Sequence, residues 1–166
     1  MTAETTYVLD ANVFIESAKN HYAFDIAPRF WEALILHSNG GRIQSIDRVK
    51  AEIDRMKDQL ADWAEKQFPH AFASTDDGAV IAAFGNLMNW VQAQAQYKDE
   101  AKAEFATVAD GWLIAYAMTS GRIVVTHEQL NPHIRRKVPI PNICQEFGVP
   151  FINSFEMLRH LGVRFE

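Results

Sequence analysis

The chain has 166 residues, 48% of them hydrophobic and 22% charged, which is typical of a single globular domain over residues 1–166 and argues against disorder. Its formal net charge of −5 argues against a protein whose whole surface binds nucleic acid, although it permits a local basic patch. The single cysteine, Cys144, excludes an internal disulfide and fits a reducing cytosol, and no apolar run is long enough to span a bilayer. We therefore expect a cytoplasmic protein that makes no membrane contact.

The first half of the chain predicts strands and helices in alternation. Asn12 and Asp47 each stand where a helix is expected to begin, Pro28 suits a first helical turn, and Phe68-Pro69 interrupts a helix. The expected elements are a strand at 7–9, a helix at 12–18, a helix from 28 to the Gly40-Gly41 pair, a strand at 42–46 and one helix from 47 to the break at 68–69.

The second half continues the alternation, with an apolar strand of β-branched residues near its middle. The expected elements are helices at 80–95, 97–105 and 108–119, a strand at 123–126, a helix at 142–147, a strand at 150–152 and a helix at 154–161. Because the two strongest strands are continuous apolar runs, the pattern indicates an α/β fold with a parallel sheet covered on both faces. In such sheets ligands bind outside the carboxyl ends of the strands.

Four carboxylates occupy positions that are unusual for surface acids. Asp10 follows the first strand, Glu128 follows the strand at 123–126 after one residue, and Glu52 and Asp110 lie on the apolar sides of their helices. Any one of them could be a helix cap or a solvated side chain. Together, with no obvious basic partner at matching offsets, they predict a site for a hard divalent cation, Mg²⁺ or Mn²⁺.

Other kinds of site have less support from the sequence. A zinc site is not expected, because Cys144 is alone and the six histidines show no paired ligand spacing. His127, beside Glu128, is interpreted as a surface or structural histidine more readily than as a catalytic one. The chain also contains no G-x-S-x-G turn and no glycine-rich loop that would cradle a phosphate.

Four motifs, each carrying one of these acids, resemble those of a known family. They stand as V-L-D-A-N-V-F-I (8–15), S-I-D-R-V-K-A-E-I (45–53), A-D-G-W-L-I-A-Y-A (109–117) and I-V-V-T-H-E (123–128). The chain resembles the PIN-domain nucleases of the VapC-like toxin kind, and more closely a subfamily of stand-alone PIN-like proteins. The resemblance implies a three-layer α/β/α sandwich with a central parallel sheet and a metal-dependent endoribonuclease activity.

The resemblance also implies roles for particular residues. Asp10, Glu52, Asp110 and Glu128 match the catalytic, metal-binding acids, and Asn12 and Thr126 match polar positions that support them. Glu128 departs from the pattern, since the family usually has aspartate there, so it is expected to bind metal through water or to contribute weakly. For Asn12 a plain helix cap is an equally good interpretation, and for Thr126 its β-propensity alone would suffice.

The resemblance further implies an RNA substrate, a homodimer and a role as the toxin of a bacterial toxin–antitoxin pair with a cognate antitoxin. The candidates for RNA binding are basic residues near the acids, namely Arg48, Lys50, Arg135, Arg136 and Lys137. A catalytically degenerate RNA- or protein-binding module is an alternative, as is a haloacid dehalogenase-like phosphatase, which would need an acid at position 12. The sequence leaves open whether RNA or DNA is cut, whether an antitoxin exists, and whether one or two ions bind.

Overall fold

The computed structural model describes residues 5–165, and their strands form one parallel sheet. The strands are β1 (Tyr7–Leu9), β2 (Ile43–Ile46), β3 (Phe72–Ala73), β4 (Ile123–Val125) and β5 (Phe151–Ile152), in the spatial order β3-β2-β1-β4-β5. The central strand β1 pairs with β2 and β4, with Tyr7 opposite both Ile43 and Ile123. Both β1 and β4 are buried along their whole length, as expected for strands covered on both faces.

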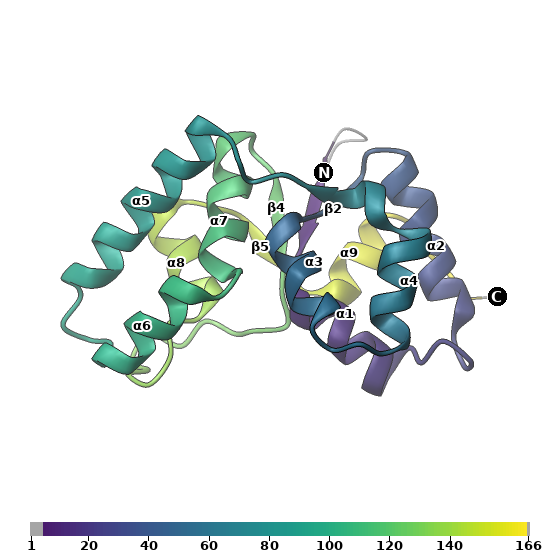
Figure 1. The fold of residues 1–166 in the computed structure, drawn as a ribbon, viewed down its shortest axis with the longest axis horizontal. Coiled ribbons are helices and arrows are strands. Elements are labelled where there is room, and N and C mark those ends of the chain that lie inside the picture. The colour runs from purple at the N-terminus through teal and green to yellow at the C-terminus, as the bar shows by residue number, and fades with distance from the viewer. Residues whose placement is uncertain (1–4, 166) are drawn as a thin grey trace.

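Helices cover both faces of this sheet. They are α1 (Ala11–Glu16), α2 (Pro28–Asn39), α3 (Asp47–Asp54), α4 (Gln59–Gln67), α5 (Gly78–Ala93), α6 (Asp99–Thr107), α7 (Asp110–Thr119), α8 (Ile140–Phe147) and α9 (Ser154–His160), with a π-helical turn η1 (Ser17–His21) and a 3₁₀ turn η2 (Pro69–Ala71). Figure 1 shows α5, α6, α7 and α8 gathered on one side of the strands, and α1, α2, α4 and α9 on the other. The expected three-layer α/β/α arrangement is confirmed.

An aromatic cluster fills the space between the sheet and the helices α1, α2 and α4. Phe14 and Phe68 are fully buried, and their ring centroids lie 5.9 Å apart. Trp63 stacks on Phe68 at 4.7 Å and meets Trp31 edge-on at 4.8 Å. Burial of each such ring is worth about 2–3 kcal/mol, so this cluster anchors α1, which follows Asp10, firmly to the sheet.

The helix predicted from residue 47 to residue 68 is wrong, because the structure divides it. Helix α3 ends at Asp54, and α4 starts at Gln59 with Asp58 as its N-cap, whose side chain accepts a hydrogen bond from the amide of Ala61 at 3.1 Å. Between them Lys57 takes the left-handed conformation with φ of 51°, which breaks the helical path. The short strand β3, next to η2, was also not predicted.

The start of the first helix differs from the prediction as well. Asp10, and not Asn12, occupies the N-cap position of α1, and Asn12 lies inside the helix, so the cap role considered for Asn12 is wrong. The helix continues beyond residue 18 through η1, in which the amide of Tyr22 bonds the carbonyl of Ser17, five residues earlier.

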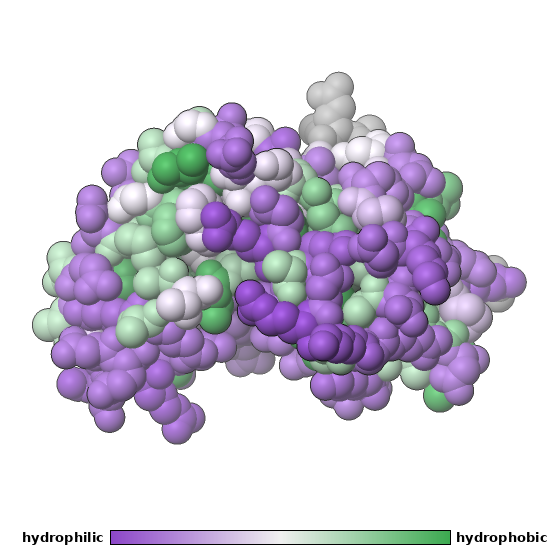
Figure 2. Space-filling model, viewed as in Figure 1, coloured by the Kyte–Doolittle hydropathy of each residue, from purple (hydrophilic) through white to green (hydrophobic). Residues whose placement is uncertain are grey.

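The surface is not uniform in polarity. On the face drawn in Figure 2, hydrophobic residues gather over α5 and α7 at the left, whereas the right side is mostly hydrophilic. Ile81 of α5 is one of the large apolar side chains that remain exposed. Within residues 5–165 no helix has the length and apolar character needed to cross a membrane.

Candidate metal centre

The carboxyl ends of β1 and β4 place two predicted site segments side by side. Asp10 directly follows β1 and is 2% exposed, and Thr126 directly follows β4. The hydroxyl of Thr126 donates to Oδ2 of Asp10 at 3.2 Å and accepts from the amide of Glu128 at 3.1 Å. One side chain thus fixes both the first acid and the backbone that carries the fourth.

The remaining acids meet at a cavity of about 180 Å³ beside this pair. Glu52 from α3, Asp110 from the first turn of α7 and Glu128 from the loop after β4 line the cavity, as does Asn12. Asp10 is buried close by, and its carboxyl group interacts electrostatically with both Glu128 and Glu52. The structure therefore brings together all four acids that the sequence singles out.

Burial and mutual repulsion make ionisation of these acids unfavourable. Burial, followed by the charge of Glu128, raises the pKa of Asp10 to about 7, although the Thr126 hydroxyl opposes the shift. Burial and then the charges of Asp10, Glu128 and Glu52 raise the pKa of Asp110 to about 8. Burial also raises the pKa of Glu52. Carboxyl groups with raised pKa values in a cleft are typical of functional sites, and a bound cation would favour their ionised form.

The donor set fits a hard divalent cation. Oε2 of Glu52 is buried and has no hydrogen-bond partner among the described residues, which is a costly arrangement unless a ligand supplies one. Within residues 5–165, no three of the four carboxylates have oxygens that all lie within 4.8 Å of one another. An ion here would therefore keep several of its waters, as Mg²⁺ usually does in proteins. Ligands that offer only oxygen atoms also favour Mg²⁺.

The acids have a basic partner that the sequence did not reveal. Nζ of Lys137 lies 3.3 Å from Oε2 of Glu128 and lines the same cavity. Burial alone would lower the pKa of Lys137, but the carboxylates of Glu128, Asp110 and Asp10 outweigh it and raise that pKa. The expectation that the acids lack a basic partner is thus wrong for Glu128. One ammonium group still offsets only part of the charge of four carboxylates.

The side chain of Glu128, one methylene longer than aspartate, also contacts the start of α8. Its Oε1 accepts a hydrogen bond at 2.9 Å from the amide of Ile140, the first residue of α8. Its other oxygen, Oε2, faces Lys137. Both oxygens of Glu128 are thus engaged, one by the amide of Ile140 and the other by Lys137.

The other basic candidates lie in different surroundings. The guanidinium of Arg48 lies 3.8 Å above the ring of Trp112, and the ammonium of Lys50 forms ion pairs with Asp54 and Glu65. Arg135 and Arg136 are exposed in the loop between β4 and α8. Only Lys137 of the five lines the cavity.

Glu104 of α6 also lines the cavity, and sequence reasoning did not single it out. It belongs to a strongly charged helix, where a further acidic residue does not stand out as a candidate for a site. Its exposed position at the rim contrasts with the buried Asp10. Glu104 therefore adds negative charge at the entrance of the cavity.

Two solved structures have similar folds at low sequence identity. One is a chain of VapBC2 from Rickettsia felis bound to a DNA fragment from their promoter, 13% identical, with a TM-score of 0.54 over 90% of this chain and 98% of that one. The other is a chain of VapBC-1 from nontypeable Haemophilus influenzae, 12% identical, with a TM-score of 0.53 over the same shares. At such identities the likeness shows the fold alone.

Sequence comparisons add a family but no activity. No curated protein matches the chain. One family model, described as "Domain of unknown function (DUF4411)", matches residues 7–165, nearly the whole of it. The chain therefore belongs to the DUF4411 family, and its fold is that of the VapC-like PIN domains.

Proposed function

We propose that this protein is a metal-dependent endoribonuclease that uses Mg²⁺ or Mn²⁺ to hydrolyse RNA phosphodiester bonds. The observation that carries the proposal is the gathering of Asp10, Glu52, Asp110 and Glu128 around one cavity at the carboxyl ends of β1 and β4. The VapC-like fold supports a nuclease. The position of the acids beside the carboxyl ends of parallel strands, where ligands bind in such sheets, supports it further.

The side chains divide the work between holding an ion and placing the substrate. Asp10, Glu52 and Asp110 supply carboxylate oxygens, and Thr126 fixes the orientation of Asp10 through its hydroxyl. When bound, a divalent ion supplies an activated water and stabilises the charge that develops on the leaving oxygen. Lys137 presents an ammonium at the cavity, where an RNA phosphate can replace Glu128 as its partner.

RNA must approach an acidic cavity on a protein of net charge −5, so local basic groups are needed. Arg135 and Arg136 are exposed in the loop that leads from Glu128 to α8 and are the best-placed candidates for phosphate contacts. Arg48 and Lys50 remain weaker candidates, since Trp112 and two carboxylates already engage them.

The biological setting is part of the proposal. The fold neighbours are chains of VapBC structures, which supports a role as the toxin of a bacterial toxin–antitoxin pair with a cognate antitoxin, acting on RNA in the cytoplasm. We further expect a homodimer, with the apolar surface of α5 near Ile81 as its interface. Light scattering of the purified protein tests the dimer, and co-purification with the product of a neighbouring gene tests the antitoxin.

The decisive experiment is cleavage of a pool of structured RNAs, and of matched DNAs, by the purified protein with Mg²⁺ or Mn²⁺. Asp10→Asn and EDTA should each abolish cutting, whereas Asp25→Asn, a change at an exposed turn, should not. Cutting that survives Asp10→Asn would refute the proposed site. If the wild type neither cuts nor binds Mn²⁺ in calorimetry, the catalytically degenerate binding module becomes the better interpretation.

A further inference from the structure

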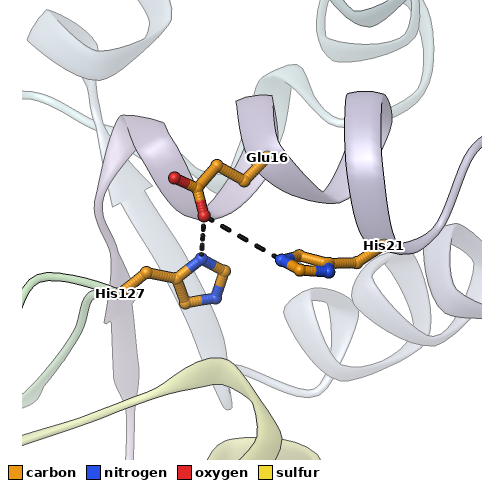
Figure 3. A group of neighbouring side chains, drawn as sticks. All are labelled: Glu16, His21 and His127. Carbon is orange, nitrogen blue, oxygen red and sulfur yellow. Dashed lines mark hydrogen bonds and ion pairs between the residues drawn. The ribbon is translucent and has the colours of Figure 1, made fainter.

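A second group of potential metal ligands lies on the opposite side of the loop that follows β4. Nδ1 of His127 is 2.9 Å from Oε2 of Glu16, and Nε2 of His21 is 3.9 Å from the same oxygen. Figure 3 shows both imidazoles with a ring nitrogen directed at the same oxygen of the Glu16 carboxylate. Within residues 5–165 these are the only three or more Asp, Glu, His or Cys side chains whose ligand atoms all lie within 4.8 Å of one another.

The π-helical turn η1 is what brings two of these residues together. Glu16 and His21 are five positions apart, which would place them on different sides of an α-helix. In η1 the wider turn, closed by the hydrogen bond from the amide of Tyr22 to the carbonyl of Ser17, carries His21 back over Glu16. Such π-helical segments are uncommon and occur frequently at functional sites.

The imidazole of His127 is held in a fixed orientation by α9. Its Nε2 lies 2.7 Å from Oγ of Ser154, and the ring of Phe155 stacks parallel to it at 6.1 Å. The side chain of His127 is 13% exposed, so the ring has little freedom to turn away. A hydrogen bond to the distal nitrogen is the usual support of a metal-binding histidine, because it leaves the other nitrogen to face the ion.

We propose that Glu16, His21 and His127 form a second metal site, which takes Zn²⁺ or a similar transition-metal ion. Two imidazoles and one carboxylate are the donors that such ions prefer, in contrast to the oxygen-only set of the acid cavity. Tetrahedral zinc with ligand distances of about 2.0–2.1 Å needs donor separations of about 3.4 Å, close to the 2.9 Å and 3.9 Å present. The proton that joins His127 to Glu16 would give way to the ion.

The two outer ligands leave the proposed site open to solvent. The side chains of His21 and Glu16 are 39% and 45% exposed, so an ion can enter without opening the fold, and a water can complete its coordination. His21 must move closer to the ion, and its exposed side chain is free to do so. The site therefore combines one fixed ligand, His127, with two adjustable ones.

A different function for the same group is a hydrolytic relay, since Ser154, His127 and Glu16 stand in hydrogen-bonded order. A nucleophilic serine must meet its substrate, and Ser154 is 0% exposed. Its hydroxyl is buried and hydrogen-bonded to His127, so no acyl group can reach it. The buried serine suits a support for the imidazole and does not suit a nucleophile.

The test is a titration of the full-length, tag-free protein with ZnCl₂ by calorimetry, in excess Mg²⁺ so that the acid cavity is supplied with its own ion. We expect one zinc ion per chain. His21→Ala and Glu16→Gln should each weaken binding roughly tenfold or more, and both change exposed side chains that the fold does not need. Cobalt in place of zinc should give visible absorption bands with the wild type that the His21→Ala variant lacks.

Two matched variants separate this site from the rest of the protein. His133→Ala removes another exposed histidine, and Asp110→Asn removes a ligand of the acid cavity; neither should alter zinc affinity. Zinc should also raise the melting temperature of the wild type and of these two variants, but not that of His21→Ala. Equal zinc binding by the His21→Ala and His133→Ala variants, or its loss in the Asp110→Asn variant, would overturn the proposal whether or not the protein cuts RNA.

Discussion

Replacing Asp110 by asparagine should stabilise the metal-free protein while removing its response to metal. The pKa of Asp110 rises from 3.8 to about 8, and at about 1.4 kcal/mol per pH unit the folded state loses roughly 6 kcal/mol of stability through this charge when fully ionised. The side-chain amide that the substitution introduces must also be desolvated, which offsets part of this gain. We therefore expect the free energy of unfolding to rise by about 2 kcal/mol, or the melting temperature by about 4–8 °C.

The sign of the pH dependence follows from the raised pKa. The folded state holds the proton of Asp110 more tightly than the unfolded state, so stability falls as pH rises from about 4 toward 8, and the advantage of Asp110→Asn grows over the same interval. Thermal melting in EDTA at about pH 8.5 and about pH 5 measures it, and the gain should shrink by more than half at the lower pH.

A matched control and a metal arm complete the measurement. Asp25→Asn, at an exposed turn, should leave the melting temperature unchanged at both pH values. Mn²⁺ should raise the melting temperature of the wild type at about pH 8.5 but not that of the Asp110→Asn variant. If Asp110→Asn lowers the melting temperature in EDTA at both pH values while Asp25→Asn does not, then Asp110 is a structural residue and the repulsion argument fails.

Three further predictions test the surroundings of the site. Lys137→Met removes the ammonium beside Glu128, so it should lower the free energy of unfolding in EDTA by about 0.5–1 kcal/mol. The same change should tighten Mn²⁺ binding several-fold. Unchanged Mn²⁺ affinity in calorimetry would contradict the role given to this ion pair. The double change Arg135→Ala and Arg136→Ala should reduce the slope of log affinity for single-stranded RNA against log salt concentration by about 1.4, as measured by fluorescence anisotropy. The melting temperature should not change. An unaltered slope would exclude these arginines from RNA binding. Asp58→Ala removes the cap of α4 and should cost about 1 kcal/mol, a fall of about 2–4 °C, and an accompanying loss of Mn²⁺ binding would show that α4 is coupled to the site.

The apolar strands carried most of the fold prediction. The continuous runs that became β1 and β4 are buried throughout and pair at the centre of the sheet, as their composition indicates. By contrast, β3 has only two residues, too few for any periodicity. The break between α3 and α4 was missed for a related reason, since it depends on a left-handed lysine, Lys57, where glycine or asparagine would have given a signal.

The acid cavity was predictable because its acids sit at positions defined by local sequence pattern. Asp10 ends a strand, and Glu52 and Asp110 lie on inward helix faces, so sequence spacing alone placed them at one edge of the sheet. Lys137 was expected only as a candidate for RNA binding, and its pairing with Glu128 gave no signal, because it lies in an irregular loop where neither helical nor strand periodicity assigns a direction to a side chain. Its contact with Glu128 depends on how that loop folds back toward α8.

The acid cavity and the proposed zinc site take different residues from one stretch of three, Thr126 to Glu128. Thr126 bonds Asp10 and Glu128 lines the acid cavity, whereas His127 between them contacts Glu16 and Ser154. The chain bends at His127 after β4 has ended, and its imidazole bonds α1 and α9 while Glu128 lines the acid cavity. An ion held by His127 would restrain the same short segment that carries Glu128, so occupancy of the proposed zinc site should reduce the mobility of Glu128 at the acid cavity.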